Sequence, residues 1–236
     1  MRAKAAAHIN KHDSIKWRSH EPSRIETFSD AAFAFALTLI IISMEVPKTF
    51  DQLTETMHGT LSFAVCFALL FNIWNTQNIF FRRYGLTDGY VVGLNAILLF
   101  VVLVYTYPLK FLFELIFSSD QAQAGMIHGD QIQSLMLIYS IGFIVIYILF
   151  FLMYRHAQKC AADLELTPAE IYATKTVKYM NLICICICFV AISFAIISPG
   201  YAGRSGFVFC SFPIAYWAWF SYRGKKGREL FPGKAA

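Results

Sequence analysis

The stretch that decides the fold is SRIETFSDAAFAFALTLIIISMEVP, residues 23–47. Ser23 and Glu26 have the spacing of a capping box, in which each side chain satisfies a backbone N–H at the start of a helix. Pro47 is expected to end this helix. The residues from Ser23 to Glu45 would extend roughly 34 Å at about 1.5 Å per residue, enough to cross a hydrocarbon core of about 30 Å. The stretch therefore predicts a membrane-spanning helix.

The composition extends this prediction to the whole chain. Hydrophobic residues make up 57% of the 236 residues and charged residues 15%, whereas soluble domains carry about 25% charged residues. Six apolar segments are long enough to span a bilayer, namely 28–46, 60–81, 90–113, 131–154, 177–198 and 205–222. We therefore expect an all-α integral membrane protein with six transmembrane helices. Its parts are an N-terminal tail (1–22), a six-helix transmembrane domain (23–222) and a basic C-terminal tail (223–236).

The positive charges predict the orientation. Of the 20 Lys and Arg residues, 17 lie in the segments that are cytoplasmic if the N-terminus is inside, and only Lys48, Lys110 and Arg204 lie on the other side. Because cytoplasmic segments are enriched in Lys and Arg, both termini are predicted to be cytoplasmic. The net charge of +5 is then a topology signal with membrane lipids as secondary contacts, and no nucleic-acid partner is expected.

Catalytic and metal sites are not expected. Cys184, Cys186 and Cys188 resemble a metal motif, but on a helix only Cys184 and Cys188 share a face, and no His lies near them. These cysteines are interpreted as small apolar fillers. The sequence shows no nucleophile–base pair, phosphate loop or metalloprotease helix. We therefore expect no enzyme, no cofactor and no metal.

Thr167 and Glu170 form a second capping box around Pro168, which predicts that the fifth span begins as a helix inside the cytoplasm.

Polar residues in the first three spans are predicted to lie at one depth, toward the cytoplasmic side. They are Ser29 and Asp30 in the first span, Asn72, Asn75, Thr76, Gln77 and Asn78 in the second, and Asn95 in the third. Unsatisfied polar groups at that depth would each cost roughly 2 kcal/mol or more, so we expect a hydrogen-bonded network. This network either fixes helix packing or takes a direct part in permeation.

A second feature of the first span is a face joined by steps of three, four or seven residues. It includes Phe28, Phe35, Thr38, Leu39 and Ile42. Such a stripe is also typical of ordinary helix packing. Thr38 can likewise bond to the carbonyl one turn earlier.

These residues resemble a known family. Arg24, Phe28, Ser29 and Asp30 fit the Arg-x-x-x-Phe-Ser-Asp signature of the transmembrane protein 175 family of potassium channels. The likeness continues through AFALTLIIISMEVP, to Trp74 and Asn95, and to Tyr107-Pro108. One six-span unit resembles the prokaryotic members. The resemblance implies a homotetramer in a prokaryotic plasma membrane.

In that family the first helix of four copies lines a central pore. The resemblance places a hydrophobic constriction at Phe35, with Leu39 and Ile42 further out, and a hydroxyl layer linked to potassium preference at Thr38. The Phe-Ser-Asp motif would join the polar network with Trp74 and the amides of the second and third spans.

This sequence departs from the family pattern at two positions. Phe35 stands where the family usually has an aliphatic residue, and no histidine follows Trp74, where Asn75, Thr76, Gln77 and Asn78 stand instead. An amide cannot take up a proton, which puts a pH response through that position in doubt. Since the sequence has no Thr-x-Gly-Tyr-Gly filter, selection would have to come from side chains.

Two alternatives remain open from the sequence. A secondary transporter or proton pathway would use Asp30 as its carrier group and would show saturable, proton-coupled flux that stops on Asp30→Asn. A non-conducting scaffold or a membrane enzyme subunit would show no flux and a stable complex with another protein.

Overall fold

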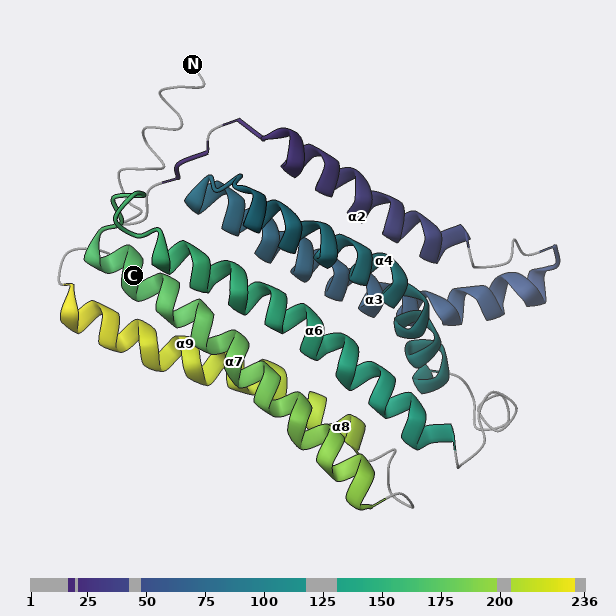
Figure 1. Ribbon diagram of the computed structural model, residues 1–236. Coiled ribbons are helices and arrows are strands. Elements are labelled where there is room, and N and C mark those ends of the chain that lie inside the picture. Colours follow the sequence, from purple (N-terminus) through teal and green to yellow (C-terminus); the bar gives the residue numbers. More distant parts are fainter. Residues whose placement is uncertain (1–16, 20, 43–47, 118–130, 199–204, 232–236) are drawn as a thin grey trace.

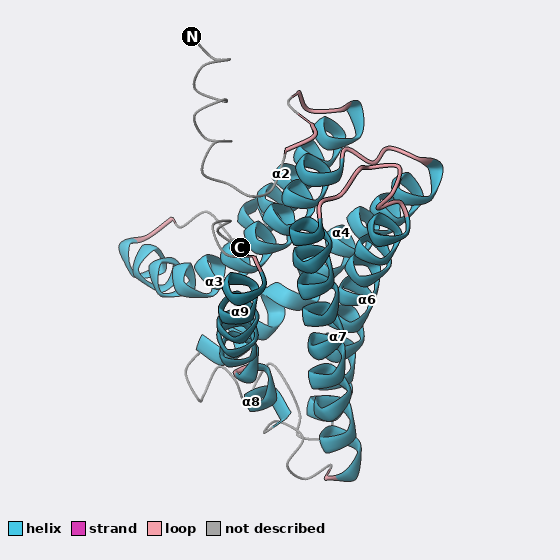
Figure 2. Ribbon diagram, turned by 90° about the vertical axis from the view of Figure 1, so that its left-hand side faces the viewer, coloured by secondary structure: helices cyan, strands magenta, loops and turns pink. Residues whose placement is uncertain are grey.

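The computed structural model describes residues 17–19, 21–42, 48–117, 131–198 and 205–231. Within these ranges the chain forms helices and short connections and no strand, as Figure 2 shows. The helices are α2 (Arg24–Ile42), α3 (Phe50–Tyr84), α4 (Gly89–Phe117), α6 (Gln131–Lys159), α7 (Pro168–Ile197), α8 (Gly206–Phe209) and α9 (Ser211–Leu230). The all-helical prediction is therefore confirmed for the described part of the chain.

Both predicted capping boxes are present. The Ser23 N–H donates to Glu26 Oε1 at 2.9 Å, and the Glu26 N–H donates to Ser23 Oγ at 3.4 Å. Thr167 and Glu170 cap α7 in the same reciprocal way, with Pro168 at the first helical position. The expected helix stops at Pro47 and at Pro199-Gly200 lie outside the described residues.

The helices pack side by side. The α6 and α7 helices lie along each other, α4 contacts α2, α3 and α6, and α9 contacts α7. Figure 1 shows α2 at one edge of this arrangement and α9 at the opposite edge. Tight packing between α4 and α6 depends on Gly142, because a Cβ there would overlap the ring of Tyr105. The Tyr105 hydroxyl donates to the Tyr139 carbonyl at 2.7 Å, which ties the two helices together at this point.

Among the described residues, five helical segments are long and apolar enough to cross a membrane. They are Arg24–Ile42, Phe63–Tyr84, Gly89–Leu112, Gln131–Lys159 and Pro168–Ile197. The sixth predicted span, 205–222, falls on α8 and on the first part of α9. The second part of α9 carries four basic residues, Arg223, Lys225, Lys226 and Arg228, and continues to Leu230. The six-span count therefore stays a prediction, and α9 runs past residue 223, where the C-terminal tail was expected to begin.

Candidate functional site

The first long helix, α2, has two unlike faces. Ser29, Phe33 and Ile40 are buried on one face, and α2 packs there against α3 and α4. Because successive residues are rotated by about 100°, Phe35 and Ile42 point to the other side. Phe35 is 57% exposed and Ile42 is 72% exposed. Within the part of the chain that the structure describes, α2 is therefore covered on one face only.

The predicted stripe lies mostly on this uncovered face. Phe28, like Phe35 and Ile42, is exposed, and Leu39 is half-buried at the edge of the face. Thr38 is exposed, and its hydroxyl donates to the Ala34 carbonyl at 2.8 Å. That bond uses the only hydroxyl proton, so the lone pairs of the exposed Thr38 Oγ1 remain able to accept a hydrogen bond or to coordinate a cation.

A buried chain of hydrogen bonds holds the other face of α2. Gln77 Nε2 of α3 donates to Asn95 Oδ1 of α4 at 2.8 Å, and Asn95 Nδ2 donates to Ser29 Oγ of α2 at 2.9 Å. Ser29 Oγ in turn donates to the Ile25 carbonyl at 2.7 Å. The side chains of Ser29, Gln77 and Asn95 are at most 2% exposed. Since burial makes an unpaired amide costly, this chain fixes how α2, α3 and α4 sit against one another.

Asp30 lies beside this chain and outside its buried part. Its Oδ1 accepts a hydrogen bond from Trp74 Nε1 at 2.7 Å, and Asp30 itself is exposed. A carboxylate that is open on one side needs a partner or water in a membrane protein. Asp30 therefore lies on the flank of α2 next to α3, about 140° around the helix from Phe35, and its carboxylate is not part of the buried chain of hydrogen bonds.

The other residues of the predicted signature and polar network lie elsewhere. Arg24 and Phe28 are exposed, and Asn75 and Asn78 are half-buried. Among the residues that the structure describes, the side chains of Asn75 and Asn78 make no hydrogen bond with Ser29 or with the amides joined to it. The structure thus brings together Ser29, Asp30, Trp74, Gln77 and Asn95 and leaves the remaining predicted residues outside this group.

Sequence reasoning missed the contact between Arg18 and Glu170. Arg18 Nη1 and Nη2 donate to Glu170 Oε1 and Oε2 at 2.9 and 3.1 Å, and Arg18 Nε donates to the Leu164 carbonyl at 3.0 Å. A bidentate pair of this kind is directional and strong. It joins the segment before α2 to the start of α7. The one sequence signal was the capping role of Glu170, whose second oxygen the cap leaves free for a cation.

Comparisons with known proteins bear on this site. The family model for the endosomal/lysosomal potassium channel TMEM175 matches residues 24–105, which hold the α2 signature and the hydrogen-bonded partners on α3 and α4. A potassium channel of Marivirga tractuosa is 35% identical over 236 residues, which cover 94% of this chain and 96% of that protein. A potassium channel of Chamaesiphon minutus is 28% identical over 119 residues, 46% of this chain and 58% of that protein.

Two solved structures of TMEM175 proteins are also similar to this chain. The chain is similar to a crystal structure of the potassium channel MtTMEM175, solved as a threonine-to-alanine variant in complex with a nanobody–MBP fusion protein. The two chains superpose with a TM-score of 0.75 and are 34% identical, and the match covers 92% of this chain and 97% of that one. A TMEM175 homologue from Chamaesiphon minutus, with a TM-score of 0.56 and 23% identity over 87% of this chain and 98% of that one, shares the fold. Nearly full-length similarity at 35% identity shows common descent. The chain belongs to the TMEM175 family.

Proposed function

We propose that this protein is a potassium channel of a prokaryotic plasma membrane, in which α2 from four copies lines a central pore. Both termini are cytoplasmic in this proposal, and potassium ions and further copies of the chain are the partners. The relatives at 35% and 34% identity are described as potassium channels, which supports the ion and the class of transport.

The uncovered face of α2 is the observation that carries the proposal. Phe35 and Ile42 are more than half exposed although α2 is apolar and packs against α3 and α4 on its other face. Lipid alone would cover an apolar face, but the uncovered face also holds the Thr38 hydroxyl, and Asp30 on the flank of the same helix exposes a carboxylate, which is costly in hydrocarbon. If four copies of α2 surround a water-filled axis, the neighbouring helices cover the apolar side chains and the water in the pore hydrates the polar ones.

The proposed pore has two working layers. A ring of four Phe35 side chains forms a hydrophobic constriction, which gates by excluding water from the narrowest part. A ring of four Thr38 side chains lies about one turn further along and offers hydroxyl oxygens that replace part of an ion's hydration shell. Because these oxygens are few and mobile compared with a cage of backbone carbonyls, the expected potassium preference is weaker than that of a carbonyl filter.

The experiment that tests the selectivity layer is Thr38→Ala. Reversal potentials of the purified channel in planar bilayers give the potassium-to-sodium permeability ratio. We expect the ratio to fall, because alanine supplies no oxygen. Ser193→Ala is the matched control, since Ser193 is an exposed hydroxyl on α7 with the same bond to a carbonyl four residues earlier. An unchanged permeability ratio in Thr38→Ala would contradict the proposal that the Thr38 hydroxyls select potassium.

A further inference from the structure

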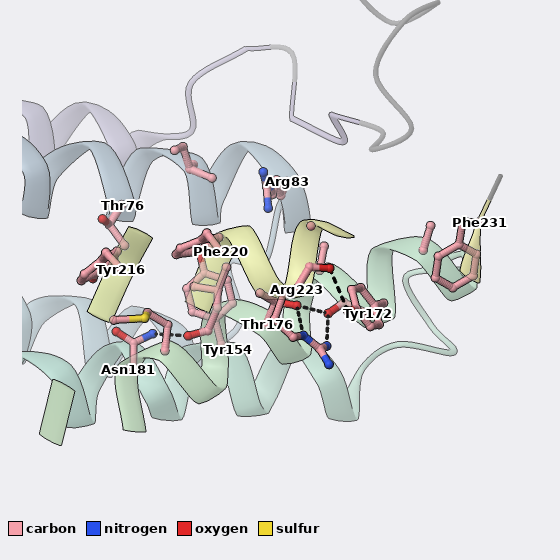
Figure 3. A pocket seen from close by; sticks show the side chains of 16 residues that line it. Thr76, Arg83, Tyr154, Tyr172, Thr176, Asn181, Tyr216, Phe220, Arg223 and Phe231 are labelled. Atoms are coloured by element: carbon pink, nitrogen blue, oxygen red, sulfur yellow. Dashed lines mark hydrogen bonds between the residues drawn. The ribbon is translucent and has the colours of Figure 1, made fainter. Parts of the chain in front are cut away.

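A cavity lies away from the uncovered face of α2, among α3, α6, α7 and α9. Its volume is about 380 Å³, within the range of small-molecule sites. Apolar side chains make up most of its wall, including Ile79, Val177, Met180 and Phe220. Two arginines, Arg83 and Arg223, also line it, and no acidic residue of the described chain does. The cavity is therefore apolar along its length and carries two positive charges (Figure 3).

Arg83 lacks a partner for a buried part of its guanidinium. Its Nε is buried and has no hydrogen-bond partner in the described part of the chain. The nearby carboxylate of Glu170 is already bound at both oxygens by Arg18. An unpaired buried N–H is costly, and more so on a charged group. In the described part of the chain the Arg83 guanidinium therefore has neither a hydrogen-bond acceptor for its Nε nor a carboxylate partner.

Arg223 is held in position on the α7 side of the cavity. Its Nε donates to Thr176 Oγ1 at 3.0 Å and its Nη2 donates to the Tyr172 carbonyl at 3.4 Å. Its guanidinium carbon lies 3.7 Å from the centre of the Tyr172 ring. Figure 3 shows this group across the cavity from Arg83. An arginine has five N–H donors, so these bonds fix the guanidinium and leave donors for a ligand.

We propose that this cavity binds an anionic phospholipid from the cytoplasmic leaflet. The lipid phosphate accepts hydrogen bonds from Arg83 and Arg223, and the acyl chain lies along the apolar wall. Planar guanidinium groups match the oxygens of a phosphate. Basic pockets between membrane helices on the cytoplasmic side bind anionic head groups in this way. A free phosphate would satisfy the arginines but would leave the apolar wall uncovered, so the lipid accounts for both features.

The inference rests on the proposed orientation, because Arg83 in the last turn of α3 and Arg223 in the basic part of α9 then lie near the cytoplasmic surface. It does not rest on ion conduction. A lipid-binding measurement can fail while potassium flux persists, and flux can fail while lipid remains bound.

The test is native mass spectrometry of the purified full-length protein after incubation with equal amounts of phosphatidylglycerol and phosphatidylcholine in mixed micelles. We expect the wild type to retain phosphatidylglycerol in preference to phosphatidylcholine. Arg83→Gln should weaken phosphatidylglycerol binding about tenfold, the size of one charge-assisted hydrogen bond. Arg82→Gln is the matched control, since Arg82 is the adjacent, exposed arginine and lies over the Trp17 ring outside the cavity. It should leave binding unchanged.

A second variant fills the cavity and keeps both charges. Ala173 lines the wall, and Ala173→Leu should also reduce phosphatidylglycerol binding, which keeps the proposal testable if Arg83→Gln does not fold. The proposal is overturned if phosphatidylglycerol shows no preference over phosphatidylcholine or if Arg83→Gln and Arg82→Gln behave alike. It is also overturned if excess inorganic phosphate displaces the lipid completely, because the site would then recognise the free anion.

Discussion

Replacing Asn95 by leucine should destabilise the protein strongly, because Asn95 is the middle of the chain of hydrogen bonds that joins α2, α3 and α4. The residue is 1% exposed and bonds to both Ser29 and Gln77. Leucine branches at Cγ as asparagine does, but it is larger and forms neither bond. Hydrogen bonds between membrane helices contribute about 0.6 kcal/mol each on average. The two lost bonds therefore account for about 1 kcal/mol.

The larger part of the expected loss in the free energy of unfolding comes from Gln77, which loses its partner. Its amide is 2% exposed, and in the described part of the chain Asn95 is its hydrogen-bond partner. A buried amide left without a partner costs about 1–3 kcal/mol. Ser29 suffers less, because it keeps its bond to the Ile25 carbonyl. Asn95→Leu should therefore lower the free energy of unfolding by about 2–4 kcal/mol in total.

The assay is reversible unfolding in mixed micelles, followed by circular dichroism at one fixed protein concentration, since the proposed assembly would make stability concentration-dependent. Asn78→Leu is the matched control, because Asn78 is half-buried and lies outside this chain of bonds. It should change stability by about 0.5 kcal/mol or less. In the double variant Gln77→Leu/Asn95→Leu the orphaned amide is gone, so its cost should fall below the sum of the single costs. Equal effects of Asn95→Leu and Asn78→Leu, or full additivity in the double variant, would refute the reasoning.

Two further predictions concern packing and the segment before α2. Gly142→Ala should lower the free energy of unfolding by about 1–3 kcal/mol because the new methyl overlaps the Tyr105 ring, whereas Gly93→Ala, with open space at that position, should raise it by up to about 1 kcal/mol. Thermal or denaturant unfolding of both variants checks this, and equal effects would contradict it. Glu170→Gln should lower the free energy of unfolding by about 3 kcal/mol because it removes the buried negative charge that pairs with Arg18, while Glu229→Gln on the exposed end of α9 should be neutral. A neutral Glu170→Gln would show that the ion pair is not needed.

The sequence predicted the helices well where a local signal existed. The capping boxes at Ser23 and Thr167 marked two helix starts, because capping depends on residues three positions apart. The end of α9 was not predicted, since the basic residues after 223 indicate a cytoplasmic location but carry no signal that ends a helix.

The sequence led us to expect that polar residues of the first three spans lie at one depth, but it predicted only some of the hydrogen bonds among them. Depth followed from the alternation of spans, and it placed Ser29, Gln77 and Asn95 together. It did not show that Asn75 and Asn78 lie outside the network, because the buried face of α3 is set by packing against α4 and α6, and the spans are apolar nearly all round. Arg18 and Glu170 are 152 residues apart, and no local pattern links them.

The central claim is that α2 lines a potassium pore with its narrowest point at Phe35. The most direct measurement is potassium and sodium flux through purified protein in liposomes, comparing wild type with Phe35→Ala. Phe189→Ala is the control, because Phe189 on α7 is 54% exposed, close to the 57% of Phe35. The account predicts potassium flux that exceeds sodium flux, rises in Phe35→Ala and is unchanged in Phe189→Ala. Correctly assembled protein without potassium flux, or equal flux in wild type and Phe35→Ala, would contradict it.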